Sequence, residues 1–261
     1  MRTNRPKELL SAGTPAIGTW LMVEADLAAV AVAAAGFDWV LIDMEHGPVS
    51  PEGAQRLVSA VLATTAAPLI RVTWNESSLI QAAYDMGAYG VLVPFVDSRD
   101  DALRAVYDAR YPPLGRRSRG GLRAPLAFAT DPVTYGRAAN DATLLAVQVE
   151  TARAVEALPE IAAVDGIDVL FVGPGDLAES MGVWPPRMDA MAPAYAEAIA
   201  RVPQVAREHG KAAGILVYDT AVARRCIELG YTFVGVGSDA TILQGAAEAI
   251  ARAMGLPRGT R

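Results

Sequence analysis

The sequence predicts a (β/α)₈ (TIM) barrel that residues 1–261 form as a single domain. Eight short apolar runs alternate with eight Ala-rich helical patterns, and this barrel requires eight such repeats in about 250 residues. Several runs are apolar at nearly every position, which is typical of parallel strands covered on both faces. The alternative, a doubly wound open sheet, usually has a Gly-rich turn after its first strand. Here that strand ends Gly18-Thr-Trp20-Leu, without such a turn.

Each expected strand is an apolar run of about the length of a buried strand, and each expected helix has a helical spacing of apolar residues. The strands are expected at about residues 15–20, 37–43, 67–73, 88–94, 143–149, 167–172, 212–217 and 232–237. The helices are expected at about 25–35, 51–62, 76–86, 98–109, 151–163, 189–208, 220–229 and 239–253. One long connection, residues 110–142, follows the fourth helix, and long connections are often functional. It could climb over the active face or reach a neighbouring subunit.

Composition argues against several classes of protein. Apolar residues make up 52% of the chain, enough for a large core, and the net charge of −6 is spread along it. The basic residues that cluster lie in one loop, at Arg116, Arg117, Arg119 and Arg123. A single loop of this kind indicates a local anion or subunit contact, so we expect no nucleic-acid partner.

The sequence also predicts where the protein works. No apolar run approaches the roughly 20 residues that span a bilayer, and the start of the chain lacks the apolar core of a signal peptide. The single cysteine, Cys226, excludes a disulfide within the chain and suits a reducing compartment. We therefore expect a soluble, cytoplasmic protein that has no membrane partner.

Polar side chains follow the carboxyl ends of the expected strands, where barrel enzymes place their active sites. Read in chain order, these ends carry Trp20, Asp43, Glu45, His46, Arg71, Glu150 and Asp176. Glu150 and Asp176 follow neighbouring strands and offer hard oxygen ligands. These favour Mg²⁺ or Mn²⁺, with positions left for water and substrate. Alternatively, each carboxylate caps the helix that begins there.

Arg71 and His46 each have a structural and a catalytic interpretation. An arginine at the edge of a buried run needs an anionic partner. That partner is either a core carboxylate or the carboxylate or developing enolate of a substrate. His46 lies three residues after Asp43, and an Asp–His pair can orient the ring for proton transfer near neutral pH. The alternative for His46 is a purely structural role.

The lysines decide between two mechanisms. Lys7 precedes the first expected strand and Lys211 begins the seventh, so neither stands at the carboxyl end of a strand. A Schiff-base enzyme needs a lysine amine beside the reacting carbonyl. If this barrel stabilises an enolate, we expect it to use a metal ion.

Six motifs along the chain are more specific together than any one alone. They are Asp-Trp-Val-Leu-Ile-Asp43-Met-Glu-His46-Gly-Pro, Leu-Ile-Arg71-Val, Gly90-Val-Leu-Val-Pro94, Arg110-Tyr-Pro-Pro-Leu-Gly, Val147-Gln-Val-Glu150-Thr and Phe171-Val-Gly-Pro-Gly-Asp176-Leu. In this order they resemble the HpcH/HpaI family of metal-dependent, class II 2-oxo acid (pyruvate) aldolases. The likeness extends from about Gly18 to Gly237.

The resemblance implies a barrel of the phosphoenolpyruvate/pyruvate type and a reversible cleavage of a 4-hydroxy-2-oxo acid. The products would be pyruvate, or a related 2-oxo acid, and an aldehyde. Glu150 and Asp176 would bind the divalent ion, which is Mg²⁺, Mn²⁺ or Co²⁺. Arg71 would steady the keto oxygen as it becomes an enolate. The backbone amides of Gly175 and Asp176 would bind the substrate carboxylate, as a helix N-terminus readily does.

Further roles follow from the same resemblance. His46, held by Asp43, would transfer protons, and Asp85 matches an acidic residue that is brought to the site across a subunit contact. Trp20, at the end of the first strand, is the remaining candidate for substrate binding. Members of the family assemble as hexamers, trimers of dimers, in which the last helix is exchanged between paired subunits.

The sequence departs from the family in one loop and leaves alternatives open. Ser118 stands where the family often has glycine, so the loop from Arg116 to Arg123 could contact substrate or a neighbouring subunit. An oxaloacetate decarboxylase or macrophomate-synthase-like enzyme would need the same metal and arginine. A non-catalytic binding barrel should have lost some of the site residues, and a phosphate-binding isomerase is hinted at by Gly235-Val-Gly237-Ser238. The aldehyde partner stays open.

Overall fold

Eight parallel strands close into a barrel in the computed structural model, which describes residues 1–186 and 192–256. Each strand pairs with the next along the chain, and β8 returns to pair with β1. The strands are β1 (Ala16–Leu21), β2 (Trp39–Asp43), β3 (Ala67–Arg71), β4 (Gly90–Val93), β5 (Leu144–Val149), β6 (Val169–Val172), β7 (Ala212–Val217) and β8 (Phe233–Ser238). The predicted barrel is therefore confirmed, and the strand bounds lie within two residues of those expected.

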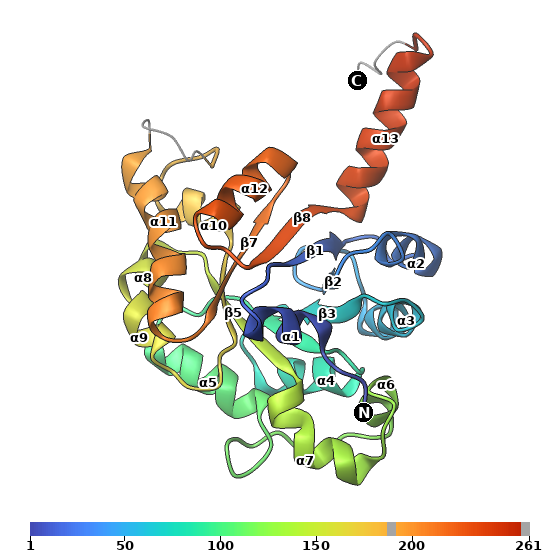
Figure 1. The fold of residues 1–261 in the computed structure, drawn as a ribbon, viewed down its shortest axis with the longest axis vertical. Helices are drawn as coiled ribbons and strands as arrows, with labels where there is room; N and C mark the ends of the chain where they lie inside the picture. The colour runs from blue at the N-terminus through green and yellow to red at the C-terminus, as the bar shows by residue number, and fades with distance from the viewer. Residues whose placement is uncertain (187–191, 257–261) are drawn as a thin grey trace.

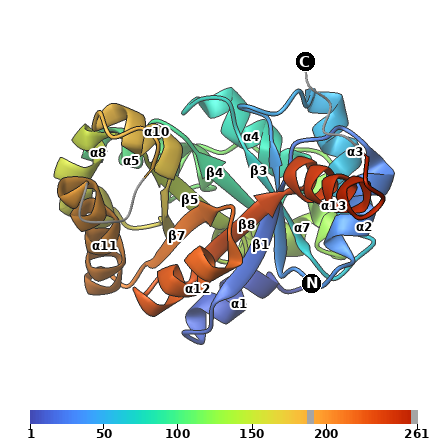
Figure 2. The same cartoon turned by 90° about the horizontal axis from the view of Figure 1, so that it is seen from above.

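Helices surround the barrel, as Figures 1 and 2 show. They are α1 (Arg5–Ser11), α2 (Asp26–Ala33), α3 (Pro51–Val61), α4 (Ser77–Asp85), α5 (Arg99–Ala109), α6 (Arg123–Ala127), α7 (Pro132–Ala142), α8 (Ala152–Glu156), α9 (Leu158–Ala162), α10 (Pro174–Ser180), α11 (Pro193–Glu208), α12 (Thr220–Glu228) and α13 (Asp239–Ala253). The sequence did not predict α1, α6 or α7, and of α10 it predicted only a helix start near Asp176. The helix expected at 151–163 is two short helices, because Pro159 lies in the first turn of a new helix that begins at Leu158. Residues 189–191 of another expected helix lie outside the described residues.

Aromatic side chains fill the interior of the barrel. The rings of Trp39 and Phe233 stack with their centroids 4.2 Å apart, and Phe171 meets Phe233 edge-on at 6.2 Å. Gly18 makes room for this layer, since a Cβ there would lie 2.1 Å from the Trp39 ring. A close-packed interior of this kind gives the strand ends a rigid support.

The long connection 110–142 closes the amino end of the barrel. It contains α6 and α7, and its Phe128 ring stacks on Tyr89, just before β4, at 4.1 Å. Asn4 donates from Nδ2 to the carbonyl oxygens of Tyr89 at 2.8 Å and Ala142 at 2.9 Å, which ties the start of the chain to the same end. The idea that this connection climbs over the active face of its own barrel is therefore wrong.

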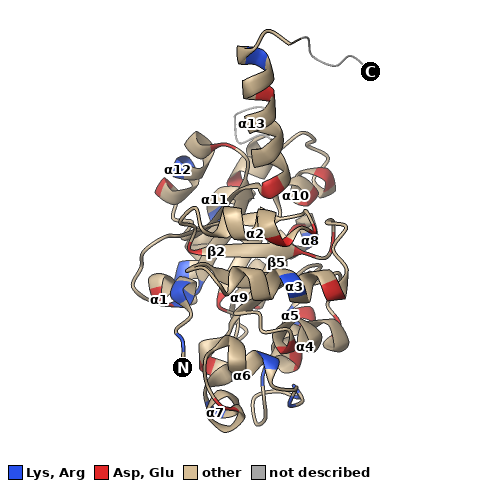
Figure 3. Ribbon diagram, turned by 90° about the vertical axis from the view of Figure 1, so that its right-hand side faces the viewer, with Lys and Arg blue, Asp and Glu red and all other residues tan. Residues whose placement is uncertain are grey.

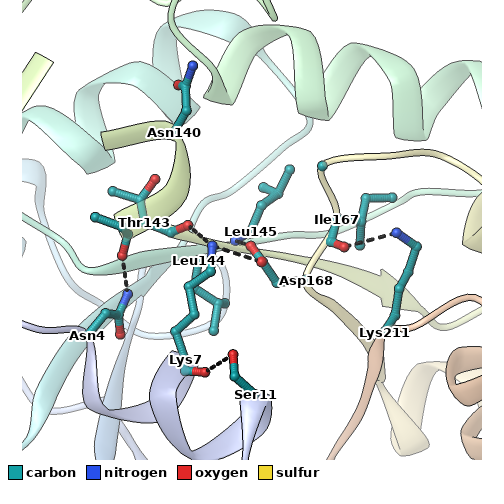
Figure 4. A network of polar contacts seen from close by, with 12 residues as sticks. Asn4, Lys7, Ser11, Asn140, Thr143, Leu144, Leu145, Ile167, Asp168 and Lys211 are labelled. Atoms are coloured by element: carbon teal, nitrogen blue, oxygen red, sulfur yellow. Dashed lines mark hydrogen bonds and ion pairs between the residues drawn. The ribbon is translucent and has the colours of Figure 1, made fainter. Parts of the chain in front are cut away.

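Both lysines lie at this amino end, as predicted. Lys7 Nζ lies 3.0 Å from Asp168 Oδ1 and also donates to the carbonyl oxygen of Thr143. Lys211 Nζ donates to the carbonyl oxygen of Ile167 at 3.0 Å (Figure 4). The two ammonium groups thus fasten the starts of β5 and β6, at the end of the barrel opposite the carboxyl ends of the strands.

The last helix, α13, stands away from the barrel (Figures 1 and 3). Its start is anchored, because the Asp239 carboxylate accepts hydrogen bonds from the amides of Met22 at 2.8 Å and Val23 at 3.0 Å. Of the described residues of α13, Asp239 alone is buried, and residues 241–250 are all exposed. No helix in the described parts of the chain is both long and apolar enough to cross a membrane.

Candidate active site

Arg71, the last residue of β3, is the centre of the cluster at the carboxyl end of the barrel. Its side chain is buried, and its guanidinium donates from Nε to Asp43 Oδ1 at 2.9 Å and from Nη2 to Asp43 Oδ2 at 2.7 Å. The parallel register pairs Asp43 of β2 directly with Arg71 of β3, which makes this two-pronged ion pair possible. A bidentate pair of this kind fixes both the position and the plane of the guanidinium.

A second carboxylate and an aromatic ring complete the surroundings of Arg71. Nη1 lies 2.7 Å from Glu45 Oε2, and the guanidinium carbon lies 4.3 Å from the centre of the Trp20 ring. Burial raises the pKa of Glu45, although the charge of Arg71 acts in the opposite direction. Trp20 is itself buried, so it packs against the cluster and holds the cation by a cation–π contact.

Glu150, directly after β5, is a buried carboxylate held by two donors. The amide of Phe95 donates to its Oε1 at 2.8 Å, and Gln148 Nε2 donates to its Oε2. Gln148 Oε1 in turn accepts from Arg71 Nη1 at 3.4 Å, so one side chain links Arg71 to Glu150. Burial raises the pKa of Glu150 from its ordinary value of 4.5 to about 7, and the negative charges of Glu45 and Asp176 add to the rise.

Glu150 and Asp176 do not cap the helices that begin beside them. The N-cap of α8 is Thr151, whose hydroxyl accepts from the amide of Ala154, and the N-cap of α10 is Gly173. Asp176 is exposed in the first turn of α10. The capping alternative for these two carboxylates is therefore wrong, and both remain available for a ligand.

His46 does not form the expected side-chain pair with Asp43. Asp43 Oδ1 accepts from the backbone amides of Glu45 at 3.0 Å and His46 at 3.3 Å, while its oxygens also hold the Arg71 guanidinium. Among the described residues, no side chain makes a hydrogen bond to the His46 ring, and His46 is exposed. Asp43 thus fixes the turn that carries His46 rather than the ring itself.

The donor set fits a divalent cation. When all four are ionised, Asp43, Glu45, Glu150 and Asp176 carry four negative charges against the one positive charge of Arg71, a net charge of −3. Burial and the negative charges of Glu45 and Asp176 raise the pKa of Glu150, and a divalent cation among these carboxylates would relieve that repulsion. In the described part of the chain, no three His, Cys, Asp or Glu side chains form a ready-made metal cage. Two carboxylate ligands with open positions are what Mg²⁺ or Mn²⁺ accepts when water and substrate complete the shell.

Asp85 and the arginine loop lie at the other end of the barrel. Asp85 is the last residue of α4, and its Oδ1 lies 3.4 Å from Arg117 Nη2. Arg117 is buried, with its guanidinium carbon 4.5 Å from the centre of the Tyr111 ring. Neither Asp85 nor this loop can reach the Glu150 cluster of its own subunit. Of the two alternatives for the loop from Arg116 to Arg123, contact with the substrate of its own subunit is therefore wrong, and contact with a neighbouring subunit stays a prediction.

Sequence reasoning missed two contacts of the cluster. Gln148 lies on β5, two residues before Glu150, which follows the end of that strand. Because the side chains of a strand alternate with a period of two, both side chains point to the same face, and this spacing could have predicted their contact. The contact of Phe95 comes from its backbone amide, which no side-chain pattern predicts.

A closed parallel barrel with buried acids and an arginine at its carboxyl end has the architecture of a barrel enzyme. The HpcH/HpaI aldolase/citrate lyase family matches residues 16–246, and the chain belongs to that family. The 4-hydroxy-2-oxo-heptane-1,7-dioate aldolase of an Escherichia coli strain is 39% identical over 253 residues, 97% of this chain and 95% of that protein.

Solved structures show the same fold. An HpcH/HpaI aldolase/citrate lyase family protein from Burkholderia cenocepacia J2315 is 37% identical with a TM-score of 0.88, over 97% of this chain and 99% of that one. Macrophomate synthase is 25% identical with a TM-score of 0.82, over 96% of this chain and 88% of that one. The family resemblance predicted from the sequence motifs is thereby confirmed.

Proposed function

We propose that the chain is a divalent-metal-dependent aldolase of 4-hydroxy-2-oxo acids, which releases pyruvate, or a related 2-oxo acid, and an aldehyde. Its family makes it an enzyme of the aldehyde-lyase class. The observation that supports the specific reaction is the link from Arg71 through Gln148 to Glu150, which puts a fixed cation beside a buried hard ligand. The single cysteine, Cys226, is buried and free, and we place the enzyme in the reducing cytoplasm.

Glu150 and Asp176 would hold the ion, Mg²⁺, Mn²⁺ or Co²⁺. When bound, the ion supplies Lewis acidity to the oxygens of the 2-oxo acid. The substrate carboxylate would accept hydrogen bonds from the amides of Gly175 and Asp176 in the first turn of α10. The N-cap of that helix, Gly173, has no side chain to cap these amides.

Arg71 supplies positive charge where negative charge develops. Cleavage next to a 2-oxo acid leaves an electron pair shared by carbon 3 and the keto oxygen, and a preorganised cation lowers the energy of that enolate. Asp43 and Glu45 form ion pairs with the guanidinium of Arg71, and the Trp20 ring covers one face of that guanidinium. The guanidinium therefore needs no rearrangement during the reaction. In this proposal Asp43 is a positioning residue.

His46 is the candidate for proton transfer. It follows the end of β2 on the turn that the Asp43 carboxylate holds, and its exposure leaves it accessible to water and substrate. Taking the proton of the 4-hydroxyl group as the carbon–carbon bond breaks needs a general base within reach, and imidazole is the side chain that most often serves as one.

A second function uses the same enolate. The likeness to macrophomate synthase favours decarboxylation of oxaloacetate as the alternative source of the enolate. A non-catalytic barrel is disfavoured, because Asp43, His46, Arg71, Glu150 and Asp176 are all present.

Pyruvate in heavy water tests the proposal without any choice of aldehyde. We expect the methyl protons of pyruvate to exchange for deuterium when Mg²⁺ or Mn²⁺ is present, and exchange to stop when a chelator is added. Proton NMR of the methyl signal measures the rate. If folded protein shows no exchange with any divalent ion but releases CO₂ from oxaloacetate, the decarboxylase replaces the aldolase as the proposed function.

We propose further that the chain forms a homo-oligomer, a hexamer built as a trimer of dimers, with α13 exchanged between paired subunits. On the exposed α13 the apolar side chains of Leu243, Ile250 and Met254 follow a helical spacing, as a stripe that packs on a partner would. In such an assembly, Asp85 would approach the active site of a neighbour.

Charges on this stripe are expected to break the assembly. Because burying a carboxylate without a partner is costly, the double variant Leu243→Glu, Ile250→Glu should lower the molar mass in solution at least twofold. Light scattering after size-exclusion chromatography measures it. The control is Gln244→Glu combined with Glu248→Lys, which changes the charge of α13 outside the stripe. Unchanged mass in the first variant contradicts the exchanged helix.

A further inference from the structure

Four aromatic side chains are exposed around the carboxyl end of the barrel: Trp74, Phe95, Trp184 and Tyr218. Trp74, Phe95 and Tyr218 follow β3, β4 and β7, and Trp184 follows α10, the helix after β6. We call these four side chains the aromatic rim. Their exposed fractions lie between 37% and 65%, and in the described residues a fifth exposed aromatic, Tyr107, is the one outside the rim. Large apolar surfaces left in water at one place indicate a binding surface.

Trp74 and Phe95 form one half of the rim. Their ring centroids are 4.3 Å apart and their planes are inclined by 35°. Phe95 has a φ of 55°, a left-handed conformation that is strained for a non-glycine residue. This conformation accompanies the donation of its amide to Glu150 at 2.8 Å. The backbone of Phe95 is therefore held at the carboxylate that we assign to the metal, and the ring that it carries lies against Trp74.

Trp184 and Tyr218 form the other half. The Trp184 ring borders Gly175, since a Cβ on that glycine would lie 3.7 Å from Trp184 Cζ3. Tyr218 comes directly after β7. Partial burial of its hydroxyl raises the pKa of that group; the charge of Arg71 opposes the rise, and those of Asp43 and Asp176 add to it. Because β5 lies between β4 and β6 in the barrel, the two halves flank Glu150 on either side.

Charge at the site disfavours an acceptor with a second carboxylate. With all four carboxylates ionised, the cluster and Arg71 have a net charge of −3, which becomes −1 with a divalent ion and −2 when pyruvate also binds. The guanidinium of Arg71 is already paired with Asp43 and Glu45, so it does not offer a further pair to a second carboxylate. An acidic tail on the aldehyde would add repulsion, whereas an apolar tail would cover the rim.

We propose that the acceptor aldehyde carries an apolar, preferably aromatic, side chain that stacks on the aromatic rim. The inference rests on the proposed aldolase function and names its second substrate class. The proposed acceptor differs from the one that the name of the Escherichia coli relative implies for that protein, since cleavage of a 4-hydroxy-2-oxo-heptane-1,7-dioate leaves an aldehyde with a carboxylate at its far end. Flat rings bind each other by offset or tilted stacking, and the Trp74–Phe95 pair offers such a surface.

A matched pair of aldehydes tests the inference. After metal-dependent exchange of pyruvate has been shown for the wild-type protein, kcat/KM for condensation with pyruvate is measured with 3-phenylpropanal and with succinic semialdehyde. We expect the aromatic aldehyde to be preferred by about tenfold or more. Trp184→Ala and Tyr218→Ala should each lower that ratio about threefold to tenfold, which is the contribution of one aromatic contact. Tyr107→Ala, which removes an exposed aromatic outside the rim, should leave the ratio unchanged.

The outcomes separate the inference from the function on which it rests. No exchange in the wild-type protein overturns the aldolase and the inference together. Exchange with a preference for succinic semialdehyde overturns the inference alone. If Trp184→Ala lowers the molar mass in solution without changing the ratio, the rim is a subunit interface, and the inference is also overturned.

Discussion

Replacing Glu150 with glutamine is expected to lower metal-dependent deuterium exchange of pyruvate by about 10³-fold. The amide is a much weaker ligand than the carboxylate, and the Lewis acidity of a bound ion contributes several kcal/mol to stabilising an enolate. Titration calorimetry with Mn²⁺ should show the loss directly, as weakened or absent binding. The matched control is Glu179→Gln, which removes an exposed carboxylate near the end of α10. This variant should bind Mn²⁺ as the wild type does. Undiminished Mn²⁺ binding by Glu150→Gln would remove Glu150 from the metal site.

The same variant is expected to be more stable than the wild type in the absence of metal at pH 8. Since burial raises the pKa of Glu150 from 4.5 to about 7, the folded protein binds a proton more tightly than the unfolded chain does. The free energy of unfolding therefore falls as pH rises from 4.5 to 7, by roughly 3 kcal/mol at 1.36 kcal/mol per pH unit. Glutamine avoids this loss but disturbs the hydrogen bond from Gln148, so we expect a net gain of about 2 kcal/mol.

Urea unfolding with a chelator present measures this difference. At pH 8 the variant should unfold at higher urea than the wild type, and near pH 5 the two should differ little, because Glu150 is then protonated in the folded wild type. Equal stability at pH 8 would show that the carboxylate is not costly where it lies. The opposite effects on stability and exchange are expected where a site keeps an unfavourable charge for function.

The sequence predicted the barrel and most of the cluster because both depend on strands. Eight buried apolar runs that alternate with helices predict a parallel barrel, in which each strand lies beside the next along the chain. Parallel strands bring their carboxyl ends to the same end of the barrel. Asp43 and Arg71 are neighbours across β2 and β3 for this reason. The same register explains why the Asp43–His46 pair was wrong: Arg71 approaches Asp43 from the adjacent strand and occupies both carboxylate oxygens.

Features that depend on loops or on other subunits could not be predicted in this way. The Phe95 amide donates to Glu150 because Phe95 has a left-handed backbone conformation, and a phenylalanine in the sequence does not predict that conformation. Residues 110–142 pack on the amino end of the barrel, where Phe128 stacks on the Tyr89 ring. This contact joins residues far apart in the chain, so no local sequence pattern predicts it. Nothing in the pattern of α13 shows that it leaves its own barrel, since an amphipathic stripe fits either surface.

Replacing Arg71 with methionine is expected to remove both activity and stability. Loss of the cation beside the developing enolate should lower exchange of pyruvate by about 10²–10³-fold, as loss of one such group does in other enzymes. The Asp43 side chain is fully buried and would keep a negative charge with backbone donors alone. Removing one partner of a buried ion pair typically costs about 3–5 kcal/mol, which urea unfolding measures.

A second substitution separates the two effects of Arg71. In the double variant Arg71→Met, Asp43→Asn, the buried charge of residue 43 is gone, so about half or more of the lost stability should return. Exchange of pyruvate should not return, because methionine still supplies no positive charge to the keto oxygen. A double variant that regains stability and activity together would show that Arg71 serves the fold and that the metal ion alone stabilises the enolate. A double variant that is stable and inactive assigns Arg71 to the chemistry.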